Sequence, residues 1–466
     1  MKICMPWTIL KKNSLAIIIG AIIIKGVFLL LFIPPWEIPD EPAHFQYAQS
    51  LAEGQGLPIF AGSKIAMSPA LYQSSQHTEF DRLRETDITV GTGPVDSNQV
   101  KGVTMVNAAV VQGPIYYLLE AIPYRLLSGF TITTQLYGMR LLSVILFALV
   151  VFLTYKIAWL IKSNRIFALT AAVLVGFQPM ASFVFAGVNN DIMVTLIASS
   201  AFYLMAKMIF NGISWKSSIA LGIIVGCGVF SKESLAPFIP LGGGLALLLT
   251  GGRIWRQRIL QSMIVMAIAS IIGLAWPLRT ALTQIPQPAV NYPEFKSQII
   301  HNSWANNTSL LLTYRLPIIF RSFWGTLSQY FYSSTVTFPK LLFYFLAGAS
   351  LFGMGGAIRF LINSRNTSIE YQLRRTVIVF LAAWVLLETL LSGTFLYNLY
   401  RHGNSFFPLQ GRYYFPLLPV MIILVLIGWE KIIPRNYHRG IYATMMFLAI
   451  ILGIYSVYPV MWLGYR

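Results

Sequence analysis

The chain has 466 residues, of which 56% are hydrophobic and only 11% are charged. A soluble protein carries roughly 25% charged residues, so this composition excludes a soluble globular domain and indicates a protein that crosses a membrane many times. Lys and Arg (34) outnumber Asp and Glu (16), and we attribute this surplus to cytoplasmic loops, which are rich in basic residues, rather than to a nucleic-acid partner.

The first expected span, residues 15–34, follows several lysines near the N-terminus. It resembles a signal peptide, but it is too long, and Pro34-Pro35-Trp36 stands where a cleavage site of small residues would be needed. We therefore expect a retained span that also acts as an uncleaved signal, with the N-terminus inside.

Apolar runs of about twenty residues, with basic loops assigned to the inside, predict about eleven transmembrane helices. The expected spans are residues 15–34, 138–160, 166–188, 191–209, 217–233, 235–251, 259–277, 340–361, 376–397, 413–429 and 441–462. This topology predicts one all-α polytopic membrane domain over residues 1–466, with the C-terminus outside. Two large loops, residues 35–137 and 278–339, are expected on the outer face.

One apolar segment, GPIYYLLEAIPYRLLSG (residues 113–129), contains Glu120, Pro123 and Arg125. If it crossed the membrane, the basic cluster after the next span would move to the outside, against the charge rule. We therefore expect an interfacial helix that lies on the outer surface within the first outer loop.

Acidic residues gather on the outer side of this topology. Glu370 and Glu430 are assigned to the inside, whereas the outer face holds a larger set. These are Glu37, Asp40, Glu41, Glu53, Glu79, Asp81, Glu85, Asp87, Asp96, Glu120, Asp191 and Glu294. Function is therefore expected on the extracytoplasmic face of the plasma (inner) membrane.

The densest acidic motif, WEIPDEPAHF (residues 36–45), begins directly after the first span. Two prolines flank Asp40 and Glu41 and stiffen the backbone. We predict that these two carboxylates act in catalysis, with Asp40 as general base, and that His44 binds substrate. The alternative is a helix cap, because an acidic residue at a helix start complements the helix dipole.

A second acidic motif, GVNNDIMV, places Asn190 and Asp191 at the outer junction of the third and fourth spans. The same capping alternative applies to Asp191. The topology puts Asp191 at the depth of Asp40, and paired carboxylates bind divalent cations through their oxygens. A site for Mg²⁺ or Mn²⁺ at Asp40 and Asp191 is therefore a further hypothesis.

Basic side chains at the outer ends of other segments complete the expected site. Arg412 stands at the start of the tenth span, Lys232 at the outer end of the fifth, and Arg321 in the second large loop. Arginine binds phosphate oxygens through a planar fork, so we predict that these residues bind substrate. Simpler explanations are snorkelling at a span end and, for Lys232, neutralisation by Glu233.

Several of these motifs together resemble the glycosyltransferase C superfamily (GT-C), the membrane transferases that use polyprenyl-phosphate sugars. They are PDEPAHF, GPIYYLL and the Asn-Asp of GVNNDIMV. Within it, QGRYYFPLLP and SFWGTL resemble a subgroup of bacterial predicted membrane proteins of unknown function. Related aminoarabinose transferases carry Lys-Pro-Pro before the interfacial helix, where this chain has Gln112-Gly113-Pro114.

The resemblance implies transfer of a sugar, with inversion, from a polyprenyl-phosphate donor to a glycan, lipid or protein acceptor on the outer face. Asp40 would take the acceptor's proton, and Arg412, a metal or both would offset the charge of the leaving group. One alternative is a lipid or polysaccharide transporter, which predicts polar groups at mid-membrane and repeat symmetry. Another is an enzyme of lipid phosphates with a His or Ser nucleophile motif. The sequence shows few polar groups at mid-membrane, no internal repeat and no recognisable His or Ser nucleophile motif.

Overall fold

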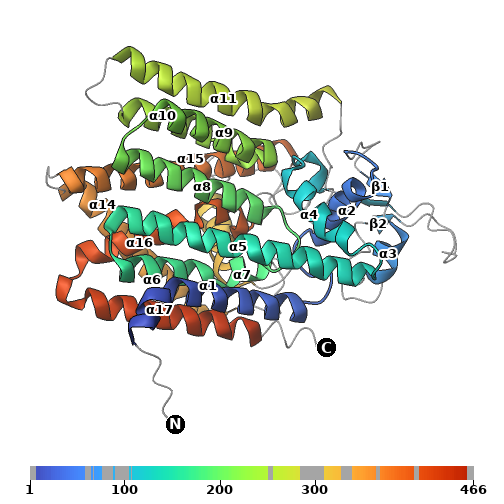
Figure 1. Cartoon of the computed structure of the whole chain (residues 1–466), viewed down its shortest axis with the longest axis horizontal. Coiled ribbons are helices and arrows are strands. Elements are labelled where there is room, and N and C mark those ends of the chain that lie inside the picture. Colours follow the sequence, from blue (N-terminus) through green and yellow to red (C-terminus); the bar gives the residue numbers. More distant parts are fainter. Residues whose placement is uncertain are drawn as a thin grey trace, which may run out of the picture.

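The structure is a computed structural model, and it describes most of the chain. The described residues are 7–57, 64–66, 68–75, 88–89, 104–106, 108–249, 255–283, 309–326, 338–363, 368–402 and 409–458. Long helices run side by side through the body of the molecule (Figure 1). The short helices α2 and α4 lie together with the small β-strands at one end of this body (Figure 1).

In the described part of the chain, eight helical segments are long and apolar enough to cross a membrane. They are formed by α1 (Trp7–Phe32), α5 (Ile132–Lys162), α8 (Asp191–Asn211), α11 (Trp255–Leu282), α14 (Lys340–Asn363), α15 (Ser368–His402), η7 (Gly411–Leu417) with α16 (Leu418–Ile432), and η8 (Arg435–Tyr437) with α17 (His438–Tyr455). The number rises to nine if α6 (Arg165–Gly176) and α7 (Pro179–Phe185) form one bent span.

Two shorter apolar helices occupy the places of the fifth and sixth expected spans. They are α9 (Trp215–Ser231) and α10 (Phe238–Leu249), joined through η3 (Glu233–Leu235). The 17 residues of α9 are about 25 Å long, which is less than the hydrocarbon core of about 30 Å. The all-helical polytopic membrane architecture is thus confirmed, whereas the count of about eleven spans and the orientation of the termini stay predictions.

The break between α6 and α7 bends the third expected span by 60°. It follows from Pro179 at the start of α7, because proline cannot continue the hydrogen-bond ladder of the preceding helix. The buried Nζ of Lys25 on α1 donates to the Gly176 carbonyl at 2.8 Å and to Ser182 Oγ at 2.5 Å. This buried lysine therefore completes the hydrogen bonding of a broken helix.

The described residues between α1 and α5 form short elements. They are α2 (Glu41–Ala52), β1 (Lys64–Ala66), α3 (Pro69–Ser75), β2 (Ile88–Thr89), β3 (Thr104–Val106), η2 (Ala108–Val111) and α4 (Ile115–Leu126). The strands form an antiparallel sheet in the order β1-β3-β2. An all-α loop was predicted, and strands of two or three residues are too short to show the alternation that reveals a strand in sequence.

The segment predicted as an interfacial helix forms α4, which is amphipathic; its position in the membrane interface stays a prediction. It packs against α2 and α5 and buries Tyr117 and Tyr124, whereas Leu118, Ile122 and Leu126 are exposed at a spacing of four residues. Such an apolar stripe beside a polar protein surface is typical of a helix that lies in the membrane interface. The helix α2 is instead almost entirely buried.

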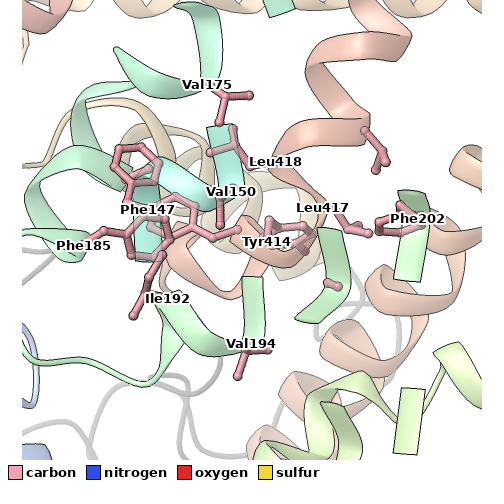
Figure 2. Packing of buried hydrophobic residues seen from close by; sticks show 14 of the residues in the cluster. Phe147, Val150, Val175, Phe185, Ile192, Val194, Phe202, Tyr414, Leu417 and Leu418 are labelled. Carbon is pink, nitrogen blue, oxygen red and sulfur yellow. The ribbon is translucent and has the colours of Figure 1, made fainter. Parts of the chain in front are cut away.

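The core lies where α5, α7, α8 and η7 meet. Figure 2 shows Phe147, Phe185 and Ile192 gathered in one cluster with Leu417 and Leu418. The rings of Phe147 and Phe185 are 5.1 Å apart between centroids. Because α8 and η7 pack against each other, the residues at their beginnings are held side by side, and these beginnings carry two of the predicted site residues.

Candidate active site

Asp40 occupies the N-cap position of α2 with a left-handed backbone (φ 60°), a conformation that Asp and Asn tolerate better than most residues. Its side chain makes no capping hydrogen bond. Half of the side chain (49%) is exposed, and its Oδ2 lies 2.5 Å from Arg412 Nη2. The carboxylate of Asp40 therefore pairs with a cation rather than capping the helix.

Arg412 is the second residue of η7 and links two acidic residues that are far apart in the chain. Its side chain is only 5% exposed, and Nη1 lies 3.5 Å from Asp191 Oδ2. Its Nε donates to the side chain of Gln410. The guanidinium thus stands between the carboxylates of Asp40 and Asp191, where its planar fork can contact both.

Lys232, which ends α9, extends this ion pairing on the other side. Its Nζ lies 2.5 Å from Asp191 Oδ1, and the Asp191 side chain is almost fully buried. The four residues Asp40, Arg412, Asp191 and Lys232, which we call the charge cluster, carry two positive and two negative formal charges. The structure thus brings together four residues that the sequence predicted for the site.

A chain of polar side chains lies next to the charge cluster. Tyr117 OH donates to Gln112 Oε1 at 3.1 Å, and Asn190 Nδ2 donates to the same oxygen at 2.7 Å and to the Ser231 carbonyl at 3.2 Å. His44 Nδ1 lies 2.8 Å from Tyr117 OH. Because the Tyr117 proton points to Gln112, this hydrogen bond assigns the ring proton of His44 to Nδ1 and leaves Nε2 as an acceptor.

Burial and neighbouring charges set the protonation states of this region. Burial lowers the pKa of His44 to about 4, against the carboxylates of Asp40 and Asp191, so the ring is neutral near pH 7. Burial acts to raise the pKa of Asp40, but the positive charges near it, Arg412 first, hold this pKa below its ordinary value. Asp40 is therefore ionised at neutral pH.

Two acceptor atoms at this site have no hydrogen-bond partner among the described residues. They are Asn190 Oδ1 and Asp191 Oδ2, and both are buried. A buried acceptor without a donor costs free energy, on the order of 1–3 kcal/mol. Such atoms point to a ligand that brings hydrogen-bond donors, such as hydroxyl groups.

Glu41 differs from Asp40 although the two are adjacent. It is fully buried, and Arg140 of α5 holds its carboxylate by two hydrogen bonds of 2.9 and 2.6 Å. The backbone amides of Trp36 and Val188 donate to the same carboxylate at 3.0 Å each. Both oxygens of Glu41 are thus occupied, and the residue ties the first outer loop to α5 and to the turn before α8.

Arg140 is the main residue that the sequence reasoning missed. Besides Glu41, its guanidinium donates to three carbonyl oxygens at the end of α1, at 2.7 to 3.0 Å. The available signal was an arginine inside an apolar span, which requires a partner in the protein interior.

A second missed arginine braces the segment that carries Arg412. Arg315, at the end of η5 (Leu311–Arg315), is buried and lies 2.5 Å from Glu388. Its Nη2 donates to Tyr414 OH at 3.0 Å, and the Tyr414 hydroxyl donates to Glu388 in turn. These contacts tie η7 to α15.

Arg321 lies on α13 (Leu316–Trp324) with an exposed side chain, and it takes no part in the ion pairs of the charge cluster. The neighbouring Ser322 contacts η7 instead, because the Gly411 amide donates to its Oγ at 2.8 Å. A Cβ on Gly411 would lie 2.2 Å from the Phe323 nitrogen, so this contact requires glycine. Substrate binding by Arg321 stays a prediction.

The geometry does not fit a metal ion shared by Asp40 and Asp191. The guanidinium of Arg412 stands where a bridging cation would need to be, and Mg²⁺ requires several more oxygen ligands around it. Across the described part of the chain, no group of three His, Cys, Asp or Glu side chains could hold a metal ion. Arg412 and Lys232 supply the positive charge at this site.

The fold and the charge cluster define a polytopic membrane protein with a polar site at one end of its helices. The family model of the predicted membrane proteins DUF2142 matches residues 23–421. The chain belongs to this family, which confirms the subgroup that the sequence predicted. No curated protein matches the chain.

Solved structures of two enzymes are similar to the chain at low identity. The apo oligosaccharyltransferase of Archaeoglobus fulgidus is 13% identical with a TM-score of 0.46, and the match covers 98% of this chain and 56% of that one. ArnT from Cupriavidus metallidurans bound to undecaprenyl phosphate is 12% identical with a TM-score of 0.49, and the match covers 97% and 77%. Apo ArnT is 14% identical with a TM-score of 0.42, at 98% and 77% coverage.

Proposed function

We propose that the protein transfers a sugar from a polyprenyl-phosphate donor to a glycan, lipid or protein acceptor at the outer face of the plasma membrane. The observation that carries this proposal is the charge cluster. It pairs a half-exposed, ionised carboxylate (Asp40) with Arg412, and it holds a second cation, Lys232, against Asp191 on the other side of Arg412, at the ends of membrane helices. A lipid-linked donor keeps its phosphate near the membrane interface, so its reacting carbon lies at this depth.

In the proposed reaction, Asp40 accepts the proton of an acceptor hydroxyl or amine. The acceptor oxygen or nitrogen bonds to the anomeric carbon while the bond from that carbon to the phosphate oxygen breaks, with inversion. The electron pair of the broken bond leaves with the polyprenyl phosphate, and Arg412 and Lys232 stabilise this anion. Atoms and charge balance without a metal ion.

Two buried acceptor atoms without a hydrogen-bond donor in the described part of the chain suit the sugar. Asn190 Oδ1 and Asp191 Oδ2 can accept hydrogen bonds from sugar hydroxyls, and a neutral His44 offers a further acceptor at Nε2. Glu41 has no open oxygen, and we assign it the structural task of holding Asp40 and the turn before α8 in place. This division leaves Asp40 as the single base.

The test is a transfer assay with purified protein and a panel of undecaprenyl-phosphate sugars, scored by release of undecaprenyl phosphate. We expect one or more donors to be turned over by the wild-type protein and not by Asp40→Asn. Turnover by neither protein with any donor, in the presence of a broad set of acceptors, would contradict the proposed function.

A further inference from the structure

Arg412 is much less exposed than the carboxylate with which it pairs. Its own side chain is only 5% exposed, whereas the side chain of Asp40 is 49% exposed. A phosphate group that approaches from the open side therefore meets the carboxylate of Asp40 before it reaches the guanidinium. Access to the cation requires that Asp40 move away.

The charges of the cluster also cancel in the structure. Arg412 pairs with Asp40 and, at longer range, with Asp191, and Lys232 pairs with Asp191. An anionic ligand gains little from a cation that already has a counter-ion, because it must displace that counter-ion first. The carboxylates of the resting cluster therefore disfavour binding of a phosphate group to Arg412 and Lys232.

Of the two carboxylates, Asp40 is the one that can leave. Asp191 is almost fully buried, and its Oδ1 is held by Lys232 at 2.5 Å. The Asp40 side chain is half exposed, makes no capping hydrogen bond and, among the described residues, forms an ion pair with Arg412 alone. A change of its side-chain rotamer breaks the ion pair with Arg412 and leaves the Asp191–Lys232 pair in place.

We propose that Asp40 is the resting counter-ion of Arg412 and that the phosphate of the lipid donor replaces it there, which releases Asp40 to act as the base. This inference rests on the proposed function, and in it the binding of the donor phosphate is the event that activates Asp40 as the base. While Asp40 is paired with Arg412, the guanidinium keeps the pKa of the Asp40 carboxyl low, and the carboxylate is a weak base. Once the phosphate replaces Asp40 at Arg412, this lowering of the Asp40 pKa is lost. Donor binding therefore precedes activation of the acceptor.

Replacement of Asp40 is expected to change donor binding and sugar transfer in opposite directions. Asp40→Asn removes the competing negative charge, so the variant binds a polyprenyl phosphate more tightly while it transfers no sugar. Asparagine keeps the size of the side chain and tolerates the left-handed backbone, so the fold is preserved. A residue that only held the donor in place would weaken binding when it was replaced.

The experiment measures binding of undecaprenyl phosphate to purified wild-type protein, Asp40→Asn and Glu53→Gln in detergent. Glu53 is the matched control, since it ends the same helix and pairs with Gln49 and Tyr124 instead of the cluster. We expect the Kd to fall about tenfold in Asp40→Asn, which corresponds to about 1.4 kcal/mol, and to change less than about twofold in Glu53→Gln. Undecaprenol, which lacks the phosphate, is expected to bind all three proteins equally.

An unchanged or higher Kd for undecaprenyl phosphate in a folded Asp40→Asn protein would overturn the exchange and leave the proposed function standing. An equal gain for undecaprenol would also overturn it, because the effect would then not concern the phosphate. If the wild-type protein and Asp40→Asn both fail to bind undecaprenyl phosphate, the proposed function fails together with the inference.

Discussion

Asp40 and Glu41 are neighbours in one motif, yet their side chains belong to two different regions of the molecule. Glu41 points into a dry interior, where Arg140 and two backbone amides occupy both of its oxygens. Asp40 points into the charge cluster with half of its side chain exposed. A carboxylate can take a proton from a substrate only if the substrate can touch it. Burial and the number of partners therefore separate a structural acid from a reactive one.

The largest effect is expected when Arg140, the cation that pairs with Glu41, is removed. Arg140→Met leaves a buried carboxylate without its cation, which typically costs about 3–5 kcal/mol. We expect little folded protein by size-exclusion chromatography in detergent and a strongly lowered Tm. The exposed Arg321→Met is the control and is expected to melt as the wild type does. If Arg140→Met melts within a degree or two of the wild type, Glu41 is not a structural brace.

The second prediction concerns Arg412, which pairs with Asp40 in the charge cluster. Arg412→Lys keeps the positive charge but loses the planar fork that contacts two carboxylates and, in our proposal, the donor phosphate. We expect the transfer rate to fall about ten- to a hundredfold, with the Tm changed by no more than a few degrees. The measurement is the initial rate of polyprenyl-phosphate release at saturating donor. A rate equal to that of the wild type would mean that charge alone is needed at this position.

The sequence placed much of this architecture correctly, because spans and charge are strong signals. Each expected span overlaps a helix, and Asp40, Asp191, Lys232 and Arg412, which were all assigned to segment ends on one side of the membrane, come together in the structure. Residues at the same depth in a membrane come into contact when their helices pack together. The sequence held no comparable signal that distinguished the role of Asp40 from that of Glu41.

The roles of these two carboxylates depend on partners far away in the chain. Arg140 lies inside the second expected span, and the amide of Val188 comes from the turn before α8. The backbone at Asp40 is also left-handed, and sequence patterns do not reveal a backbone dihedral. Pro179 was a local signal in the sequence for the helix break after Gly176, but the third expected span, residues 166–188, was predicted as continuous.

The third and smallest effect tests a buried carboxyl that has no cation. Glu120 on α4 is hydrogen-bonded by Ser143 at 3.0 Å, and burial raises its pKa to about 8, from an ordinary value of 4.5, against that hydrogen bond. A raised folded-state pKa gives stability that is fully present below about pH 4.5 and is lost as the pH rises through about 8. We expect the Tm to fall by a few degrees between pH 5 and 8.5.

Glu120→Gln removes the titrating group and keeps the shape of the side chain. The variant is expected to show a flatter Tm profile over the same pH range than the wild type. If the two profiles have the same slope, another group causes the pH dependence, and the contrast between Glu120 and the cation-paired Glu41 loses its support.

The division of roles between the two neighbours is tested most directly by one paired measurement. Asp40→Asn and Glu41→Gln are purified, the folded fraction of each is determined, and the transfer rate is expressed per folded molecule. We predict that Asp40→Asn keeps its Tm and loses on the order of a hundred- to ten-thousand-fold in rate. Glu41→Gln is predicted to have a lower Tm and a rate per folded molecule within about fivefold of the wild type. A folded Asp40→Asn that retains most of its rate, or a stable Glu41→Gln that is inactive, would contradict the account.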